Sequence, residues 1–354
     1  MKTIKNFKVL LLACSAVILT IAGCTKEEQS QSEASNNPVA NKLDPERASG
    51  NTVLTVTGSG LGDMTSIVFE NGNVPASFNP VLNTDNAIIF RVPDTANGGT
   101  QNIVLTNRIG AQVKVPFNVV ALPLVNTVSN YNFTEGTEIT LVGNNLADVT
   151  TVTLDGTSAA ASIVSQTKKQ LVIKMPATTV NSAKLIVTNS TGPVTTSQEF
   201  VNTDNAFKIF TEGYDNNYQN ASWGSDAFVS STVAKSGTKS VGKSYAKGNW
   251  HQLGFGWDNF SNTANYKYLT FWIKGASLDY SLYISTSASV GGFASFNENA
   301  KIAVPANVWT YYKLPLSTLN LWATSTAFNQ IGWRIQGPET QDETFYLDDV
   351  MFVK

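Results

Sequence analysis

The chain has 354 residues, with 26 acidic and 24 basic side chains, one histidine and two cysteines. A mildly acidic chain without a basic block is not expected to bind nucleic acid, or to lie on a membrane through clustered lysines. The single histidine excludes the multi-histidine sites of most catalytic zinc enzymes.

The amino-terminal 23 residues are expected to be a signal peptide. Three lysines precede an apolar run over residues 9–21, which is too short to span a bilayer. The run ends in Ile-Ala-Gly-Cys at residues 21–24, which resembles the lipobox of bacterial lipoproteins. This resemblance implies cleavage before Cys24 and acylation of its thiol and new amino group, which gives a stable membrane anchor. An ordinary secretory signal with an incidental cysteine is the alternative.

Residues 24–42 are expected to form a flexible tether. An acidic pair, Glu27 and Glu28, follows the cysteine and resembles the surface-export signal of Bacteroidetes lipoproteins. The segment after it is rich in Ser, Asn and Gln and has almost no apolar side chains, so it cannot bury enough surface to fold. Cleavage would remove three lysines and Cys14, leaving 21 basic against 26 acidic residues, about −5, and no cysteine pair for a disulfide.

The middle of the chain contains an internal repeat. Residues 56–63, 87–93 and 102–107 are echoed by residues 141–148, 170–176 and 184–189. Each copy consists of short β-branched runs separated by Gly, Asn, Asp and Pro, without a competing helical period. A unit of about 80 residues with such strands predicts a small antiparallel sandwich.

Both copies have a Gly-x-x-Leu after a Val/Thr strand and a closing Val/Leu-Thr-Asn strand, and these phrases resemble IPT/TIG domains, an immunoglobulin-like family. The resemblance covers residues 43–121 and 122–203. Such domains serve as spacers or as binding modules. Neither copy contains Trp or His, and Tyr131 is the only tyrosine in them, which favours spacers.

The region 204–354 has a different composition and carries all seven tryptophans. Strands are predicted at residues 207–212, 240–246, 268–274, 280–286, 308–314, 330–336 and 344–353. About 150 residues with eight or more strands fit a two-sheet jelly roll. The phrases at 236–240, 269–275, 309–317 and 345–350 resemble carbohydrate-binding-module jelly rolls of the galactose-binding-like type. The whole chain is therefore predicted to be all-β.

Strand alternation in this last region separates candidate ligand contacts from core residues. Between Trp250 and Trp257, one face carries Trp250 and Gln252 beside Gly254 and Gly256. Glycine lets a ligand approach the backbone closely, so this face is predicted to be an open shelf. The opposite face carries His251, Leu253, Phe255 and Trp257.

A second alternating run places Ile331, Trp333 and Ile335 on one face, and Arg334 and Gln336 on the other. A planar Arg fork and an amide suit sugar hydroxyls or a carboxylate. A solvated outer face is the alternative.

The remaining aromatic residues divide by context. Trp272, Trp309 and Trp333 have apolar strand neighbours and are expected in the core, whereas Trp223 and Trp322 lie in loop-like contexts that suit the rim of a site. Trp257 fits either class. His251 is expected to be a hydrogen-bonding neighbour rather than a base.

A structural calcium site is a further expectation. The acidic pair Asp348 and Asp349 follows a β phrase that often borders such a site in jelly-roll binding modules, and Glu212 on the first strand is the natural partner of Asp349. The alternative is that Asp348 faces water.

Catalysis is not expected. There is no G-x-S-x-G elbow to pair with the histidine. A glycosidase needs two carboxylates in different environments, but no strand reads like E-x-D-x-E and the acidic residues lie mostly in turns. A β-sandwich lyase remains open, because His251, Arg334 and Gln336 are of the types that such enzymes use. No cofactor beyond the calcium ion is expected.

The whole arrangement resembles the surface glycan-binding lipoproteins of Bacteroidetes polysaccharide-utilisation systems. It implies an outer-membrane lipoprotein, facing the exterior, that captures a polysaccharide and delivers it to a TonB-dependent transporter of the SusC type with its SusD-like partner. The alternatives are a polysaccharide lyase or hydrolase on the same jelly roll, and a surface adhesin that binds a protein.

Overall fold

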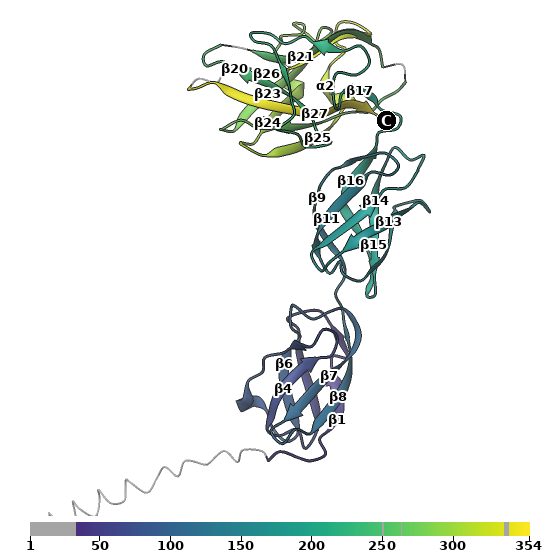
Figure 1. The fold of residues 1–354 in the computed structure, drawn as a ribbon, viewed down its shortest axis with the longest axis vertical. Coiled ribbons are helices and arrows are strands. Elements are labelled where there is room, and N and C mark those ends of the chain that lie inside the picture. Colours follow the sequence, from purple (N-terminus) through teal and green to yellow (C-terminus); the bar gives the residue numbers. More distant parts are fainter. Residues whose placement is uncertain (1–32, 250, 263, 336–339) are drawn as a thin grey trace, which may run out of the picture. The chain divides into compact units, whose positions relative to one another are not determined.

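The computed structural model describes residues 33–249, 251–262, 264–335 and 340–354. The chain forms two compact units, Met1–Ala121 and Leu122–Lys354. Almost all regular structure is β, which confirms the predicted fold class (Figure 1). Within the described residues, no helix has the length and apolar character needed to cross a membrane.

The first unit is a sandwich of two sheets. One sheet has the order β1 (Val39–Asp44), β3 (Val53–Ser59), β6 (Ala87–Arg91), and the other has the order β2 (Arg47–Ala48), β8 (Gln112–Val119), β7 (Gly99–Asn107), β4 (Met64–Phe69), β5 (Val74–Pro75). Strand alternation points Leu54 and Phe90 inward from one sheet and Phe69 and Phe117 inward from the other. A short 3-10 turn, η1 (Pro80–Leu82), precedes β6.

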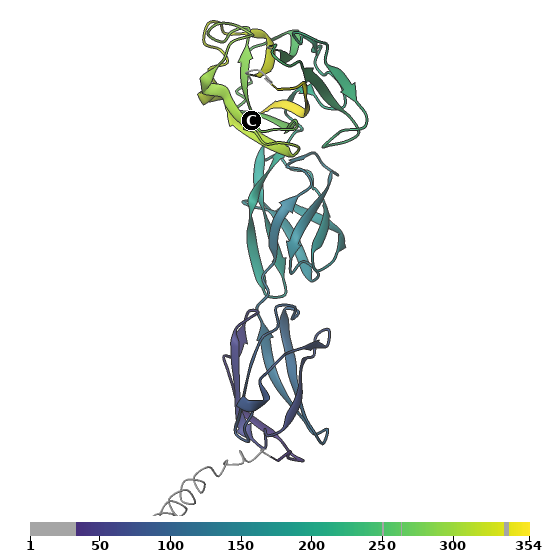
Figure 2. The same ribbon diagram turned by 90° about the vertical axis from the view of Figure 1, so that its left-hand side faces the viewer.

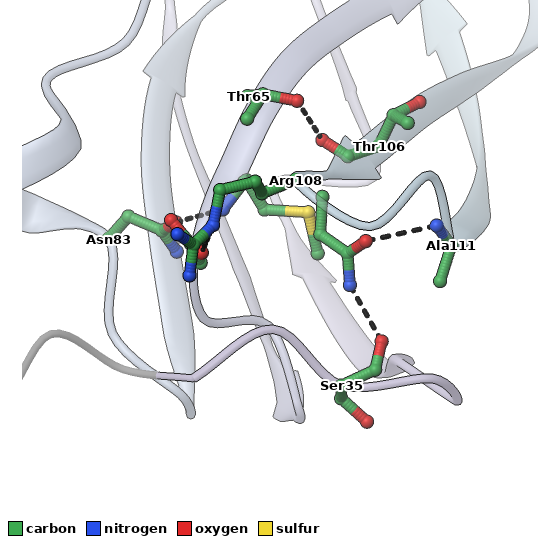
Figure 3. A network of polar contacts seen from close by, with 9 residues as sticks. Ser35, Thr65, Asn83, Thr106, Arg108 and Ala111 are labelled. Carbon is green, nitrogen blue, oxygen red and sulfur yellow. Dashed lines mark hydrogen bonds and ion pairs between the residues drawn. The ribbon is translucent and has the colours of Figure 1, made fainter.

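A polar network closes one end of this sandwich (Figure 3). Arg108 donates from Nε to a carboxylate oxygen of Asp63 at 2.5 Å, and the main-chain N–H of Met64 donates to the side chain of Asn83 at 2.8 Å. Asn107, the last residue of β7, donates to the carbonyl oxygen of Ser35 at 2.6 Å. Residues 35–42, which were expected to belong to the tether, are therefore part of the first domain.

The second unit begins with the other copy of the repeat. Its eight strands are β9 (Leu124–Val128), β10 (Asn132–Phe133), β11 (Glu138–Asn144), β12 (Val149–Leu154), β13 (Ala160–Gln166), β14 (Gln170–Lys174), β15 (Ser182–Asn189) and β16 (Gly192–Asn202). Asn189 ends β15 as Asn107 ends β7, and its amide donates to the carbonyl oxygen of Asn145 at 3.3 Å. A contact one residue further on does correspond: Asp148 accepts from the Ser190 hydroxyl, as Asp63 accepts from Arg108. The repeat seen in the sequence is thus a repeat of strands and of this contact.

The carboxyl-terminal domain is a jelly roll of two sheets, seen from two directions in Figures 1 and 2. The first sheet has the order β19 (Phe228–Ser230), β20 (Ser240–Tyr245), β27 (Glu343–Val353), β22 (Tyr268–Lys274), β25 (Trp309–Pro315), with β17 (Phe207–Phe210) also paired to β27. The second sheet has the order β18 (Gln219–Asn220), β21 (Gln252–Phe260), β26 (Phe328–Ile335), β23 (Tyr280–Thr286), β24 (Lys301–Val304). A one-turn helix, α2 (Leu316–Leu319), and a 3-10 turn, η2 (Glu298–Ala300), complete the domain.

The core of the jelly roll lies between these sheets. Trp333 is fully buried and packs edge-on against Phe255 of its own sheet and Phe271 of the facing sheet, with ring centroids 5.8 and 5.1 Å apart. The structure therefore places Trp333 in the core, as its apolar neighbours predicted.

Trp272 is buried for another reason. It points away from this core and contacts the second repeat, where its ring lies 5.6 Å from that of Tyr131 and its indole N–H donates to Asn130 at 3.1 Å. The expectation that Trp272 fills its own domain's core is wrong, because its strand presents it on the outer face. Neighbouring domains of one chain thus share a packed aromatic contact.

Candidate functional site

The shelf predicted along β21 is covered. A Cβ atom on Gly254 would lie 2.5 Å from the ring of Phe293 and 2.7 Å from the carbonyl oxygen of Ala221. Gln252 is fully buried, and its amide donates to the carbonyl oxygen of Phe293 at 2.6 Å. The prediction of an open shelf is wrong, because the long connection between β23 and β24 folds back over it. Trp250 lies outside the described residues.

Arg334 is held by the same connection. Its guanidinium donates to the carbonyl oxygen of Ala294 and lies 3.7 Å from the ring centroid of Phe296. Partial burial lowers the pKa of Arg334 from its usual value. The Arg334 guanidinium is therefore bound by residues of its own domain. Gln336 lies outside the described residues.

His251 is a structural neighbour, as expected. It is buried, and its Nδ1 lies 3.4 Å from the carbonyl oxygen of Ser244 and accepts from the N–H of Ala246 at 3.5 Å. A Cβ atom on Gly224 would lie 2.3 Å from the imidazole ring. The histidine thus packs tightly between segments of the fold.

Of the tryptophans that the structure describes, two are more than half exposed: Trp223 at 52% and Trp257 at 59%. Trp257 has a φ of 87°, where a residue with a side chain is strained, and it follows Gly256 at a register shift between β21 and β26. The irregularity turns this ring to the surface, so Trp257 does not belong to the core. Both rings remain candidate ligand contacts at the β18 side of the second sheet.

Trp322 is half-buried and packs against Phe260 and Phe328 at 5.9 and 5.2 Å. It lines a hollow of about 670 Å³ together with hydroxyl and amide side chains: Ser261, Asn262, Thr324, Ser325 and Thr326. Its position suits a rim residue, although its ring also supports the core.

A set of side chains that strand alternation did not single out lies on the outer face of the first sheet. The register of five neighbouring strands aligns Phe228 of β19, Gly242 of β20, Tyr346 of β27, Lys274 of β22 and Trp309 of β25. We call Phe228, Tyr346, Lys274 and Trp309 the aromatic row. Four strand spacings of about 4.8 Å give it a length of roughly 19 Å.

The rings of the aromatic row form a nearly continuous surface at one end. Phe228 and Tyr346 meet edge to face at 6.1 Å, and a Cβ atom on Gly242 would lie 2.6 and 2.9 Å from them. The ammonium of Lys274 lies 5.8 Å from the centroid of Tyr346. Flat rings with polar tips stack on sugar rings, and the ammonium adds three hydrogen-bond donors.

Sequence reasoning missed this row although the signal was present. In β27, Tyr346 alternates with the core residues Phe345 and Leu347, and in β22 Lys274 follows the core residue Ile273. Trp309, expected in the core, is only half-buried and is paired with Lys274. Alternation identifies which residues point outward, but only the strand order aligns them into one row.

The expected calcium ligands lie together. Glu212 and Asp349 line one cavity of about 220 Å³. The Glu212 carboxylate accepts from the N–H and hydroxyl of Thr238 at 3.0 and 2.8 Å, and Asp349 accepts from Asn132 at 3.3 Å. Among the residues that the structure describes, no group of three or more His, Cys, Asp or Glu side chains is placed to hold a metal ion. Calcium stays a prediction.

Asp348 does not face water. It is fully buried, and one carboxylate oxygen accepts from the main-chain N–H groups of Lys235 and Ser236 at 2.8 and 3.0 Å. Burial raises the pKa of Asp348 to about 7, and the neighbouring Asp349 adds to the rise. The expected alternative of an exposed Asp348 is therefore wrong.

The two N-terminal sandwiches define the chain as a protein with immunoglobulin-like β domains. Residues 38–117 and 123–207 match the model of the IPT/TIG domain. No curated protein matches the sequence.

Solved structures extend the likeness to nearly the whole chain. A surface glycan-binding protein, PbSGBP-B from Prevotella bryantii, has 17% identity and a TM-score of 0.53 over 91% of this chain and 99% of its own. SGBP-B from a xyloglucan utilisation locus of Bacteroides uniformis has 19% identity and a TM-score of 0.41 over 90% and 99%. At these identities the likeness to PbSGBP-B concerns the fold alone.

Proposed function

We propose that this protein binds a polysaccharide at the cell surface through the outer face of its carboxyl-terminal jelly roll. The aromatic row is the observation that carries the proposal. Phe228 is 43% exposed on the outer face of the first sheet, and Tyr346, Lys274 and Trp309 continue the same line across three more strands. A row of rings of roughly 19 Å suits several consecutive sugar rings better than a compact small molecule.

The fold that this chain shares with a surface glycan-binding protein supports the proposal. The finer arrangement is also part of it: a lipid anchor at Cys24 in the outer membrane, IPT/TIG domains as spacers, and delivery to a TonB-dependent transporter with a SusD-like partner. The lipobox and the acidic pair after it support the anchor and the outward orientation.

Affinity electrophoresis of the chain from residue 24 onward tests the function. The gels contain soluble xyloglucan, mixed-linkage β-glucan, arabinoxylan, glucomannan or polygalacturonate, and bovine albumin is the non-binding control. At least one polymer should retard the protein and leave albumin unaffected. A protein that no soluble polysaccharide retards contradicts the proposal, and unsaturated products in the gel would indicate a lyase instead.

A further inference from the structure

Three consecutive residues of the second IPT/TIG domain contact aromatic side chains of the jelly roll. Tyr131 stacks on Tyr311 with ring centroids 4.8 Å apart and an interplanar angle of 21°. Asn130 accepts from the indole N–H of Trp272 at 3.1 Å, and Asn132 accepts from the hydroxyl of Tyr311 at 2.8 Å. We call Asn130, Tyr131 and Asn132 the clamp.

The clamp contacts strands that carry the aromatic row. Its partners Trp272 and Tyr311 lie opposite each other on β22 and β25, and Trp272 also lies opposite Asp348 on β27. Each of these three residues is two positions along its strand from a member of the row: Trp272 from Lys274, Tyr311 from Trp309, and Asp348 from Tyr346. Residues two apart on a strand share a face and lie about 7 Å apart.

A β-bulge in β27 allows a further contact between this strand and the clamp. The register with β22 shifts between Thr270 and Trp272, and Asp349 has a φ of 49°. This irregularity brings the Asp349 carboxylate to the amide of Asn132 at 3.3 Å. A strained residue at a contact between domains indicates that the surrounding packing fixes the strand there.

The contact is largely buried and polar groups in it are paired. Trp272 is 4% exposed and Asn132 5% exposed. Burial raises the pKa of the Tyr311 hydroxyl, which donates to Asn132. An ion pair of Lys313 with Glu199 at 3.1 Å extends the contact along β25. Separating the two domains would expose the Trp272 ring to water, and this loss of apolar burial opposes separation.

From this geometry we infer that the second IPT/TIG domain is a positioning element of the glycan-binding face, with Tyr131 as the positioning residue, rather than only a spacer. The inference rests on the proposed function of the aromatic row. The clamp fixes the side chains that lie beside the aromatic row, namely Trp272, Tyr311 and Asp348. It thereby fixes the spacing of β27, β22 and β25. Ligand affinity then depends on a domain that does not itself contribute a ring to the row.

Tyr131 variants of the chain from residue 24 onward test the inference, with the polymer that retards the wild type most. Tyr131→Ala should weaken binding by about threefold to tenfold, the range expected for losing one or two aromatic contacts. Tyr131→Phe keeps the ring and should bind as the wild type does. Val164→Ala changes an exposed side chain of the same domain and serves as the matched control. The melting temperature of each variant is measured alongside.

A wild-type experiment covers the case in which Tyr131→Ala does not fold. Coupling between sites is reciprocal, so bound polysaccharide should slow hydrogen exchange at Asn132 and Phe133. Unchanged exchange there, unchanged affinity of a folded Tyr131→Ala, or an equal loss with Tyr131→Phe overturns the inference and leaves the proposed function standing. A wild type that binds none of the polymers contradicts the proposed function itself.

Discussion

At the scale of single residues, four of the described tryptophans show three different kinds of environment. Trp333 packs between the sheets, Trp272 packs between domains, and Trp223 and Trp257 are more than half exposed. The sequence shows that a tryptophan alternates with polar neighbours, but not which surface covers it. That difference decides whether a substitution affects stability, domain contact or ligand binding.

Trp333→Ala should lower the free energy of unfolding of the jelly roll by about 3–5 kcal/mol, because it removes a fully buried ring between Phe255 and Phe271. Trp257→Ala should change it by less than about 1 kcal/mol, since that ring is 59% exposed. Chemical denaturation followed by circular dichroism measures both. Equal losses would show that Trp257 also supports the fold.

At the scale of elements, the sequence predicted the strands better than the connections. β22 and β23 have the predicted bounds, because both are β-branched and aromatic runs between turn residues. The loop from Ser287 to Asn297 has no hydrophobic periodicity in its sequence. The sequence therefore did not predict that this loop folds over Gln252 and Gly254. The shelf was therefore assigned to a face that the structure covers, and the outer face of the other sheet was overlooked.

The acidic residues of β27 give the second unit a pH dependence. The folded pKa of Asp348, about 7, exceeds the ordinary aspartate value of 3.8, so the folded state binds the proton more tightly. The free energy of unfolding should therefore fall as the pH rises from about 4 to 7. The pKa values of Glu199 and Glu343 are lowered from 4.5. These two groups therefore make the free energy of unfolding rise with pH, but only at pH values below about 4.5. Asp348→Asn should flatten this slope in thermal melts between pH 4.5 and 7.5, and an unchanged slope would rule out Asp348 as its source.

At the scale of the whole molecule, the repeat predicts a boundary after residue 121, where the two compact units divide, and the change of composition predicts another at residue 204. The contact between the second and third domains does not follow, because its residues are distant in the sequence: Tyr131 meets Trp272 and Tyr311. Spacers that lack tryptophan and histidine were expected to be passive. In the structure, the second one covers aromatic surface of the jelly roll.

Because of this contact, we expect the smallest stable fragment that contains the aromatic row to include the second domain. A fragment of residues 122–354 should fold and melt as these residues do in the full chain, since they form one compact unit. A fragment of residues 204–354 exposes Trp272, Met351 and Val353, which are otherwise buried. It should therefore aggregate more readily or melt several degrees lower. Size-exclusion chromatography and thermal melts compare the two, and equal behaviour would contradict a tight contact.

The anchor makes a separate prediction. Cys24→Ala should leave the protein without acylation and abolish its fractionation with outer-membrane lipoproteins, because the thiol is the site of lipid attachment in a lipobox. Fractionation of cells followed by immunoblotting measures this. Retention of the variant in the lipidated membrane fraction would show that the cysteine is incidental.

The central claim is that the aromatic row binds the polysaccharide, and isothermal titration calorimetry of Tyr346→Ala against the best polymer tests it most directly. Base stacking on a protein ring contributes about 1–3 kcal/mol by alanine substitution, and stacking of a sugar ring is expected to be of similar size. Tyr346→Ala should therefore bind about tenfold more weakly or worse, with an unchanged melting temperature, while Trp257→Ala binds as the wild type does. Wild-type affinity of Tyr346→Ala together with a loss of binding by Trp257→Ala would contradict the account and place the site at the β18 side of the second sheet.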